Sequence, residues 1–243
     1  MGVYADRGNM IALVARCLRS GIGCQVTAIG IGDRLPAEAD LVLIGGGQDR
    51  EQRRIAGELA GRGALLREWA EQGAAMLAVC GGFQLFGRSY RTAAGDELPG
   101  VGIFDAVTVA PGPGWQRCIG DVLARAEIEG VGEVVGFENH GGRTYLGPRA
   151  RPFAQVLYGY GNNGDDGAEG ALAGAAIGTY LHGSVLPKNP ALTDHLLRAA
   201  LRHRYGDGGA ELLALDDPYA ERAHRAAAAV ARQRGRARAA VRW

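Results

Sequence analysis

The chain has 243 residues, of which 47% are hydrophobic and 22% are charged, as in a folded globular protein. This composition excludes a disordered chain, and a formal net charge of +1 gives the whole chain no electrostatic reason to bind nucleic acid or a membrane surface. No segment reaches the roughly 18 apolar residues of a membrane span, and the first residues lack the basic and apolar regions of a signal peptide. We therefore expect a cytoplasmic protein.

Short apolar segments alternate with longer helical segments in the first part of the chain, which is typical of an α/β protein with a mainly parallel sheet. A helix is predicted first, over residues 7–21. The strands predicted after it cover 24–29, 41–44 and 74–79. One or two helices are expected over 51–72, and another helix begins at Phe83.

The second part of the chain is predicted to be rich in short strands and loops, followed by helices. The predicted strands cover 101–104, 106–109, 119–127, 133–137, 152–160 and 176–181. A closing helix is expected over 192–205, and an Ala/Arg-rich helical tail with a poor apolar face follows it. We predict one main domain over 1–205 and a peripheral tail over 206–243.

Cys80 is the cysteine best placed for chemistry. It follows the strand predicted over 74–79 and precedes two glycines and a helix, so its thiol lies at a strand-to-helix corner. A helix N-terminus stabilises a thiolate, and the glycines permit a strained turn and the close approach of a substrate. A buried structural cysteine is the alternative. The remaining cysteines, which have no zinc-binding spacing, are interpreted as structural: Cys17, Cys24 and Cys118.

A nucleophilic cysteine needs a base, and His182 is the best placed of the five histidines. It follows the apolar run over 175–181 and therefore also lies at a strand end. His140, at the end of another predicted strand, is the second candidate. These positions favour a Cys80–His182 pair.

A run of three glycines, Gly45 to Gly47, follows the strand predicted over 41–44. Its backbone N–H groups could face a developing oxyanion opposite the amide of Gly81, because both lie at the carboxyl ends of neighbouring strands. A flexible turn is the alternative interpretation. The chain contains neither a P-loop nor a strand-bound G-x-G-x-x-G motif, so no ATP or dinucleotide site is predicted.

Two segments give the chain a resemblance to class I glutamine amidotransferases, in the branch of the cobyric acid synthases: residues 78–84 (AVCGGFQ) and 178–183 (GTYLHG). The chain more closely resembles the GatD subunits of lipid II isoglutaminyl synthases. That resemblance is carried by three further segments: 45–52 (GGGQDREQ), 136–144 (GFENHGGRT) and 181–190 (LHGSVLPKNP). It extends to about residue 205 and implies a flavodoxin-like α/β fold.

The resemblance implies that Cys80 attacks the side-chain amide of L-glutamine and that a thioester follows, which water then cleaves. His182 would deprotonate the thiol and then protonate the departing ammonia. The resemblance also implies positions that bind the substrate or its oxyanion: Arg117, Gln84, Gly46 and Gly81. An arginine suits the amino-acid carboxylate, because its planar fork binds a carboxylate at two points.

The implied partner is a subunit that resembles a Mur ligase (MurT). With ATP and Mg²⁺ of its own, it would use the ammonia to amidate the α-carboxylate of D-glutamate in the peptidoglycan stem peptide of lipid II. No cofactor and no metal ion are expected in this chain, and lipid II is expected to be bound through the partner.

Two features depart from the family pattern. Most class I members orient the histidine with a glutamate two residues further on, where this chain has Ser184. The orienting group would be another residue, a backbone carbonyl or an acid of the partner, and our hypothesis is that the partner completes the site. In addition, relatives begin with an apolar strand before the Tyr-x-Asp-x-Gly-Asn segment, which here covers 4–9, so the first strand is expected to be missing.

Two other functions compete with this one. The first is the amidotransferase of a cobyrinic or cobyric acid amidase system, whose members carry an ATP-binding domain in the same chain. The second is a non-enzymatic scaffold whose arginine-rich end, with seven arginines and one acid over 221–243, binds a partner or nucleic acid. The joint presence of Cys80, His182, Gln84 and Arg117 argues against the scaffold.

Overall fold

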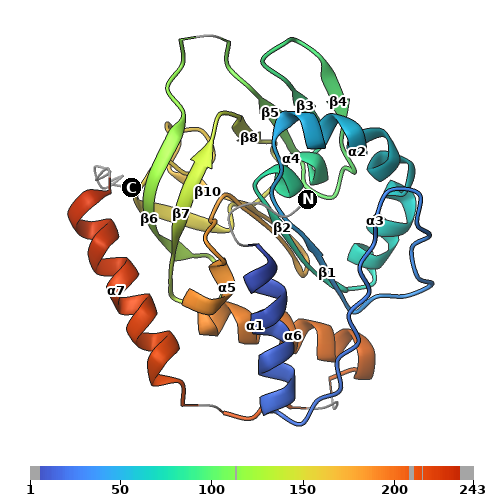
Figure 1. Ribbon diagram of the computed structural model, residues 1–243, viewed down its shortest axis with the longest axis vertical. Helices are drawn as coiled ribbons and strands as arrows, with labels where there is room; N and C mark the ends of the chain where they lie inside the picture. Colours follow the sequence, from blue (N-terminus) through green and yellow to red (C-terminus); the bar gives the residue numbers. More distant parts are fainter. Residues whose placement is uncertain (1–5, 113, 208–210, 215, 236–243) are drawn as a thin grey trace.

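The computed structural model describes residues 6–112, 114–207, 211–214 and 216–235. Its central sheet has the strand order β1-β2-β12-β11 (Figure 1). The four strands are β1 (Leu41–Ile44), β2 (Ala75–Val79), β12 (Ala176–Thr179) and β11 (Ala171–Ala173). β1, β2 and β12 are parallel, and β11 is antiparallel to β12. This confirms the predicted α/β class with a mainly parallel central sheet.

β2 is the centre of the core, since all five of its residues are buried. The helices around the central sheet are α1 (Arg7–Arg19), α2 (Asp49–Gly61), α3 (Gly63–Glu71), α4 (Gly81–Phe86), α5 (Val185–Lys188) and α6 (Pro190–Tyr205). α4 packs on β2 and β12, while α6 packs on β1 and β2. No described helix combines the length and the apolar character needed to cross a membrane.

Two further four-stranded sheets fill the second part of the chain, as the strand-rich pattern predicted. One has the order β4-β3-β5-β8, with β3 (Ser89–Arg91), β4 (Glu97–Pro99), β5 (Ala106–Val109) and β8 (Arg143–Leu146). The other has the order β10-β9-β6-β7, with β6 (Cys118–Ala126), β7 (Glu133–His140), β9 (Ala154–Tyr158) and β10 (Ala168–Glu169). His182 forms an isolated antiparallel bridge with Phe137 of β7. This sheet therefore meets the central sheet just after the carboxyl end of β12.

Two of the predicted strands are wrong. The first, 24–29, has no regular structure, and β1 pairs only with β2 among the described residues. A strand needs a neighbour to complete its ladder of hydrogen bonds, and the apolar pattern at 24–29 does not supply one. Residues 101–104 also lack strand structure, because their backbone N–H groups bond to α4 and the turn after it, as in the hydrogen bond from Val101 N to the Leu85 carbonyl.

The helical tail includes α7 (Pro218–Arg234), which lies against β6 and β7 at one edge of the molecule (Figure 1). Its poor apolar face is a stripe of alanines, and Ala228 and Ala231 are buried against Leu123 and Val135. Small side chains let the helix approach the sheet closely, which explains how a weakly apolar helix packs there. The predicted helical character of the tail is confirmed over Pro218–Arg234, and residues 236–243 lie outside the described part. The domain boundary at residue 205 stays a prediction.

Candidate active site

Cys80 lies in a strained turn between β2 and α4. Its backbone has φ 50° and ψ −106°, a left-handed conformation that L-residues other than glycine seldom adopt. The Cys80 N–H donates to the Thr179 carbonyl (2.8 Å), which keeps this turn in register with β12. Gly82 permits the turn, because a Cβ there would lie 2.7 Å from the Ile44 carbonyl oxygen. The predicted strand-to-helix corner is confirmed together with its backbone strain, and the Cys80 side chain is largely buried there, with 7% of its surface exposed.

His182 follows β12 and is fully buried. Its backbone N–H donates to the Phe137 carbonyl (2.7 Å), which holds the loop after β12 against β7. Burial alone would lower the pKa of the imidazole. Interactions with the Asp6 carboxylate and with Cys80 outweigh the burial and raise the pKa to about 9. At neutral pH the His182 imidazole is therefore expected to carry a positive charge next to the Cys80 sulfur.

Asp6 is the site residue that the sequence interpretation missed. Its carboxylate is buried, and its Oδ1 lies 3.7 Å from His182 Nδ1. Its Oδ2 accepts a hydrogen bond from the Gly46 N–H (2.6 Å). The signal in the sequence that points to Asp6 is the Tyr-x-Asp-x-Gly-Asn segment at 4–9.

The three-glycine loop lies beside the start of α4, as predicted. A Cβ on Gly81 would lie 3.0 Å from the Gly47 nitrogen, so these two backbone segments are in close contact. As the first residue of α4, Gly81 has an N–H that no helical carbonyl can accept. The Gly46 N–H differs from the expectation, because it is donated to Asp6 and not directed toward a substrate.

Cys80 opens into a cleft of about 640 Å³, which Arg117 also lines. The Arg117 guanidinium donates from Nε (3.2 Å) and Nη2 (3.0 Å) to the Asn139 side-chain oxygen, and it is exposed to solvent. The polar residues that line the cleft include Gln52, Gln84, Asn139 and His140, and Gly47 lies on its wall as well. The structure therefore brings Arg117, Gln84 and Cys80 to one cavity, with His182 buried next to Cys80.

Gln84 lies one helical turn after Cys80, in α4, and its side chain is buried. Its side-chain Nε2 donates to the Tyr180 hydroxyl (3.1 Å), while its Oε1 accepts from Gln52 Nε2 (2.8 Å). The amide is thus held by the protein on both sides. A role for Gln84 in shaping the cleft floor fits these contacts.

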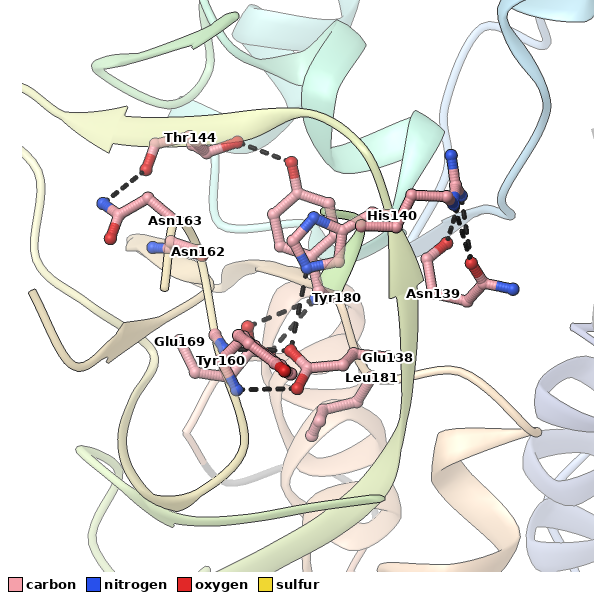
Figure 2. A network of polar contacts seen from close by, with 12 residues as sticks. Glu138, Asn139, His140, Thr144, Tyr160, Asn162, Asn163, Glu169, Tyr180 and Leu181 are labelled. Atoms are coloured by element: carbon pink, nitrogen blue, oxygen red, sulfur yellow. Dashed lines mark hydrogen bonds and ion pairs between the residues drawn. The ribbon is translucent and has the colours of Figure 1, made fainter. Parts of the chain in front are cut away.

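His140, the second candidate base, lies on the wall of the cleft and is held there by a network of contacts (Figure 2). Its ring stacks on Tyr180 with 3.6 Å between the centroids, and its Nδ1 bonds to the Gly142 carbonyl (2.8 Å). Burial lowers the pKa of His140, although Glu138, 3.7 Å from its Nε2, opposes this. Glu138 in turn accepts the Tyr160 N–H (2.6 Å). These contacts favour a neutral, fixed imidazole over a mobile base.

A family model for CobB/CobQ-like glutamine amidotransferase domains matches residues 15–190. The chain belongs to this family. It is 40% identical over 205 residues to the GatD subunit of lipid II isoglutaminyl synthase (glutamine-hydrolyzing) from Staphylococcus aureus, covering 84% of this chain and 82% of the relative. It is 35% identical over 208 residues to the corresponding subunit from Streptococcus pneumoniae, covering 85% and 78%.

This amidotransferase is also 37% identical over 179 residues to the cobyric acid synthase of Pelotomaculum thermopropionicum, where the match covers 69% of the chain but only 33% of the relative. Among solved structures, the PurLQS of Thermotoga maritima matches with a TM-score of 0.57 at 16% identity, covering 79% of this chain and 92% of that chain. A crystal structure of a glutamine amidotransferase matches with a TM-score of 0.51 at 18% identity, covering 78% and 93%. These two structures show the fold.

Proposed function

We propose that this glutamine amidotransferase is the glutaminase subunit of a lipid II isoglutaminyl synthase, with Cys80 as nucleophile and His182 as general base and acid. The observation that carries the chemistry is the strained Cys80 turn beside a buried histidine whose pKa is raised to about 9. The choice of pathway is supported by the two GatD relatives, which are matched over most of their length. The chain covers only a third of the cobyric acid synthase.

The reaction begins when the Cys80 thiolate attacks the side-chain amide carbon of L-glutamine. The tetrahedral adduct collapses as the His182 imidazolium gives its proton to the departing nitrogen, which leaves as ammonia. A γ-glutamyl thioester remains on Cys80. The neutral His182 then removes a proton from water, whose oxygen attacks the thioester, and glutamate departs as the Cys80 thiolate is restored.

The negative oxygen of each adduct needs hydrogen-bond donors, and we assign this role to the N–H groups of Gly81 and Gly47. The Gly81 N–H has no helical acceptor, and the two segments are in close contact at the mouth of the Cys80 turn. The sequence interpretation placed the second donor at Gly46. Because the Gly46 N–H is donated to Asp6, we assign the second donor to the next residue, Gly47.

Arg117 is assigned to the α-carboxylate of glutamine. It lies on the wall of the same cleft as Cys80, and Asn139 holds its guanidinium by the side-chain oxygen. A planar fork in that position binds a carboxylate through two parallel hydrogen bonds and so fixes the distance from the carboxylate to the reacting amide. Gln84 supports the cleft floor through Tyr180 and Gln52.

The ammonia would pass to a Mur-ligase-like partner that binds ATP and Mg²⁺ and amidates the α-carboxylate of D-glutamate in lipid II. The names of both GatD relatives describe them as subunits, which supports a heteromeric enzyme. A cobyrinic or cobyric acid amidase system is the alternative, and a scaffold without activity is the second alternative.

The deciding experiment uses ¹⁵N-amide glutamine with the full chain, alone and with a Mur-ligase-like protein of the same organism, ATP and lipid II. We expect glutamate release that requires Cys80, rises with the partner and transfers ¹⁵N to lipid II. Cys80→Ala should abolish the release, while Cys17→Ala, which removes a buried thiol of α1, should retain it. Transfer to a cobyrinate instead would assign the alternative pathway, and no turnover by a folded chain would favour the scaffold.

A further inference from the structure

The start of α1 is attached to the loop that carries His182. Gly8 packs so closely on Ser184 that a Cβ at residue 8 would lie 2.1 Å from the Ser184 hydroxyl oxygen. The Asn9 side-chain oxygen accepts the Leu186 N–H (2.9 Å), and Asn9 is buried. Two residues of the Asp-x-Gly-Asn segment thus fix the first turn of α1 against the residues that follow His182.

The first residue of this segment, Asp6, lies between the His182 loop and the three-glycine loop. Its Oδ2 accepts the Gly46 N–H (2.6 Å), and its Oδ1 lies 3.7 Å from His182 Nδ1. Only 3% of Asp6 is exposed, and within the described ranges its Oδ1 has no hydrogen-bond partner. A buried carboxylate oxygen that faces a buried imidazole without another donor is costly unless it stabilises positive charge on that imidazole.

We propose that Asp6 is the positioning carboxylate of His182, so that this chain supplies from its own N-terminal segment the acid that is missing two residues after the histidine. Asp6 holds Nδ1 and leaves the other ring nitrogen for proton exchange with Cys80. Because the same carboxylate binds Gly46, it also fixes the glycine loop relative to the histidine. The inference rests on the proposed Cys80–His182 chemistry, and it differs from the hypothesis of an acid supplied by the partner.

The electrostatics of the site agree with this assignment. The titratable groups that act on His182 are Asp6, at the start of α1, and Cys80, at the start of α4. Burial works against the imidazolium, and these two groups raise the pKa to about 9 in spite of it. Removal of the Asp6 charge is therefore expected to lower the pKa of His182, since the burial remains.

The test is Asp6→Asn in the full chain, with Asp194→Asn as the matched control. Asp194 pairs with Arg16 of α1 (2.6 Å), so the control loosens the same helix without touching His182. Two quantities are measured: the pKa of His182 by NMR of ¹⁵N-labelled imidazoles, assigned with His182→Gln, and kcat and KM for glutamine. We expect Asp6→Asn to lower the His182 pKa and to reduce kcat about 100-fold or more at little change in KM. Asp194→Asn should change neither.

An unchanged His182 pKa and kcat in Asp6→Asn would overturn the proposal. So would an activity loss in Asp6→Asn that is fully restored by the partner, because the partner would then be the source of the acid. If Asp6→Asn does not fold, Asp6→Glu is the second variant. It keeps the negative charge but places the carboxylate further from the backbone. A kcat and a His182 pKa equal to those of the wild type in Asp6→Glu would count against a positioning role for Asp6. The NMR titration needs no substrate, so the result remains readable even if the proposed pathway is wrong.

Discussion

Glu169, in β10, has a buried carboxyl group that contacts the residues just before His182. Its Oε1 accepts hydrogen bonds from the Thr179 hydroxyl and from the Tyr180 N–H (3.1 Å). Burial, reinforced by the negative charge of Glu138, raises the pKa of Glu169 from 4.5 to about 7, although the bond from Thr179 opposes the shift. This residue makes the stability of the whole fold depend on pH.

The magnitude follows from the two pKa values. Between pH 4.5 and about 7 the folded chain keeps a proton on Glu169 that the unfolded chain has lost, so the free energy of unfolding falls as the pH rises through this range. Each pKa unit corresponds to about 1.4 kcal/mol, which gives a loss of about 3 kcal/mol by pH 8. Glu169→Gln keeps an acceptor oxygen for Thr179 and Tyr180 but cannot ionise, so it should escape this loss.

The assay is urea unfolding at pH 5 and pH 8, followed by circular dichroism, for the wild type, Glu169→Gln and Glu97→Gln. Glu97 is exposed on β4 and controls for the removal of one surface charge. We expect the stability of Glu169→Gln relative to the wild type to rise by about 2.5 kcal/mol between pH 5 and pH 8, and that of Glu97→Gln to stay nearly constant. Parallel pH curves for all three proteins would refute the reasoning.

Three further outcomes are expected. Gly82→Ala places a Cβ 2.7 Å from the Ile44 carbonyl and should destabilise the fold by about 1–3 kcal/mol in urea unfolding, and a loss below 0.5 kcal/mol would contradict the packing described. Arg117→Lys loses the planar fork and should raise KM for glutamine about 10-fold with a smaller effect on kcat, whereas an unchanged KM would remove Arg117 from the substrate site. Ala231→Asp buries a charge under α7 and should speed hydrogen exchange over residues 218–234, while Arg232→Ala, which removes an exposed ion pair with Glu133, should leave exchange there nearly unchanged.

The elements that could be predicted from the sequence are those with a local signal. Cys80 and His182 each follow an apolar strand and precede a glycine, and parallel strands bring their carboxyl ends to one edge, so the pair follows from the pattern. β1 is predicted by a short continuous apolar run, and α1 is predicted by apolar residues at helical spacing. The chain order of these segments then indicated the α/β class.

The elements that failed depend on a partner far away in the chain. A strand over 24–29 was predicted from its own residues, but strand structure also requires a neighbouring ladder. Asp6 carries no periodic signal, and its contact with His182 joins residues separated by most of the chain. The position of Gly46 as an oxyanion donor failed similarly, because only the three-dimensional structure shows that Asp6 takes its N–H.

The separation between Cys80 and His182 has a consequence for the protein during its synthesis. A ribosome adds about 5–20 residues per second, so roughly 5–20 s pass between the synthesis of Cys80 and the synthesis of His182. During that interval β2 has no β12 beside it, and the Cys80 turn lacks the acceptor at Thr179 that holds it. Under the proposed chemistry, a nascent chain that ends before His182 therefore cannot hydrolyse glutamine.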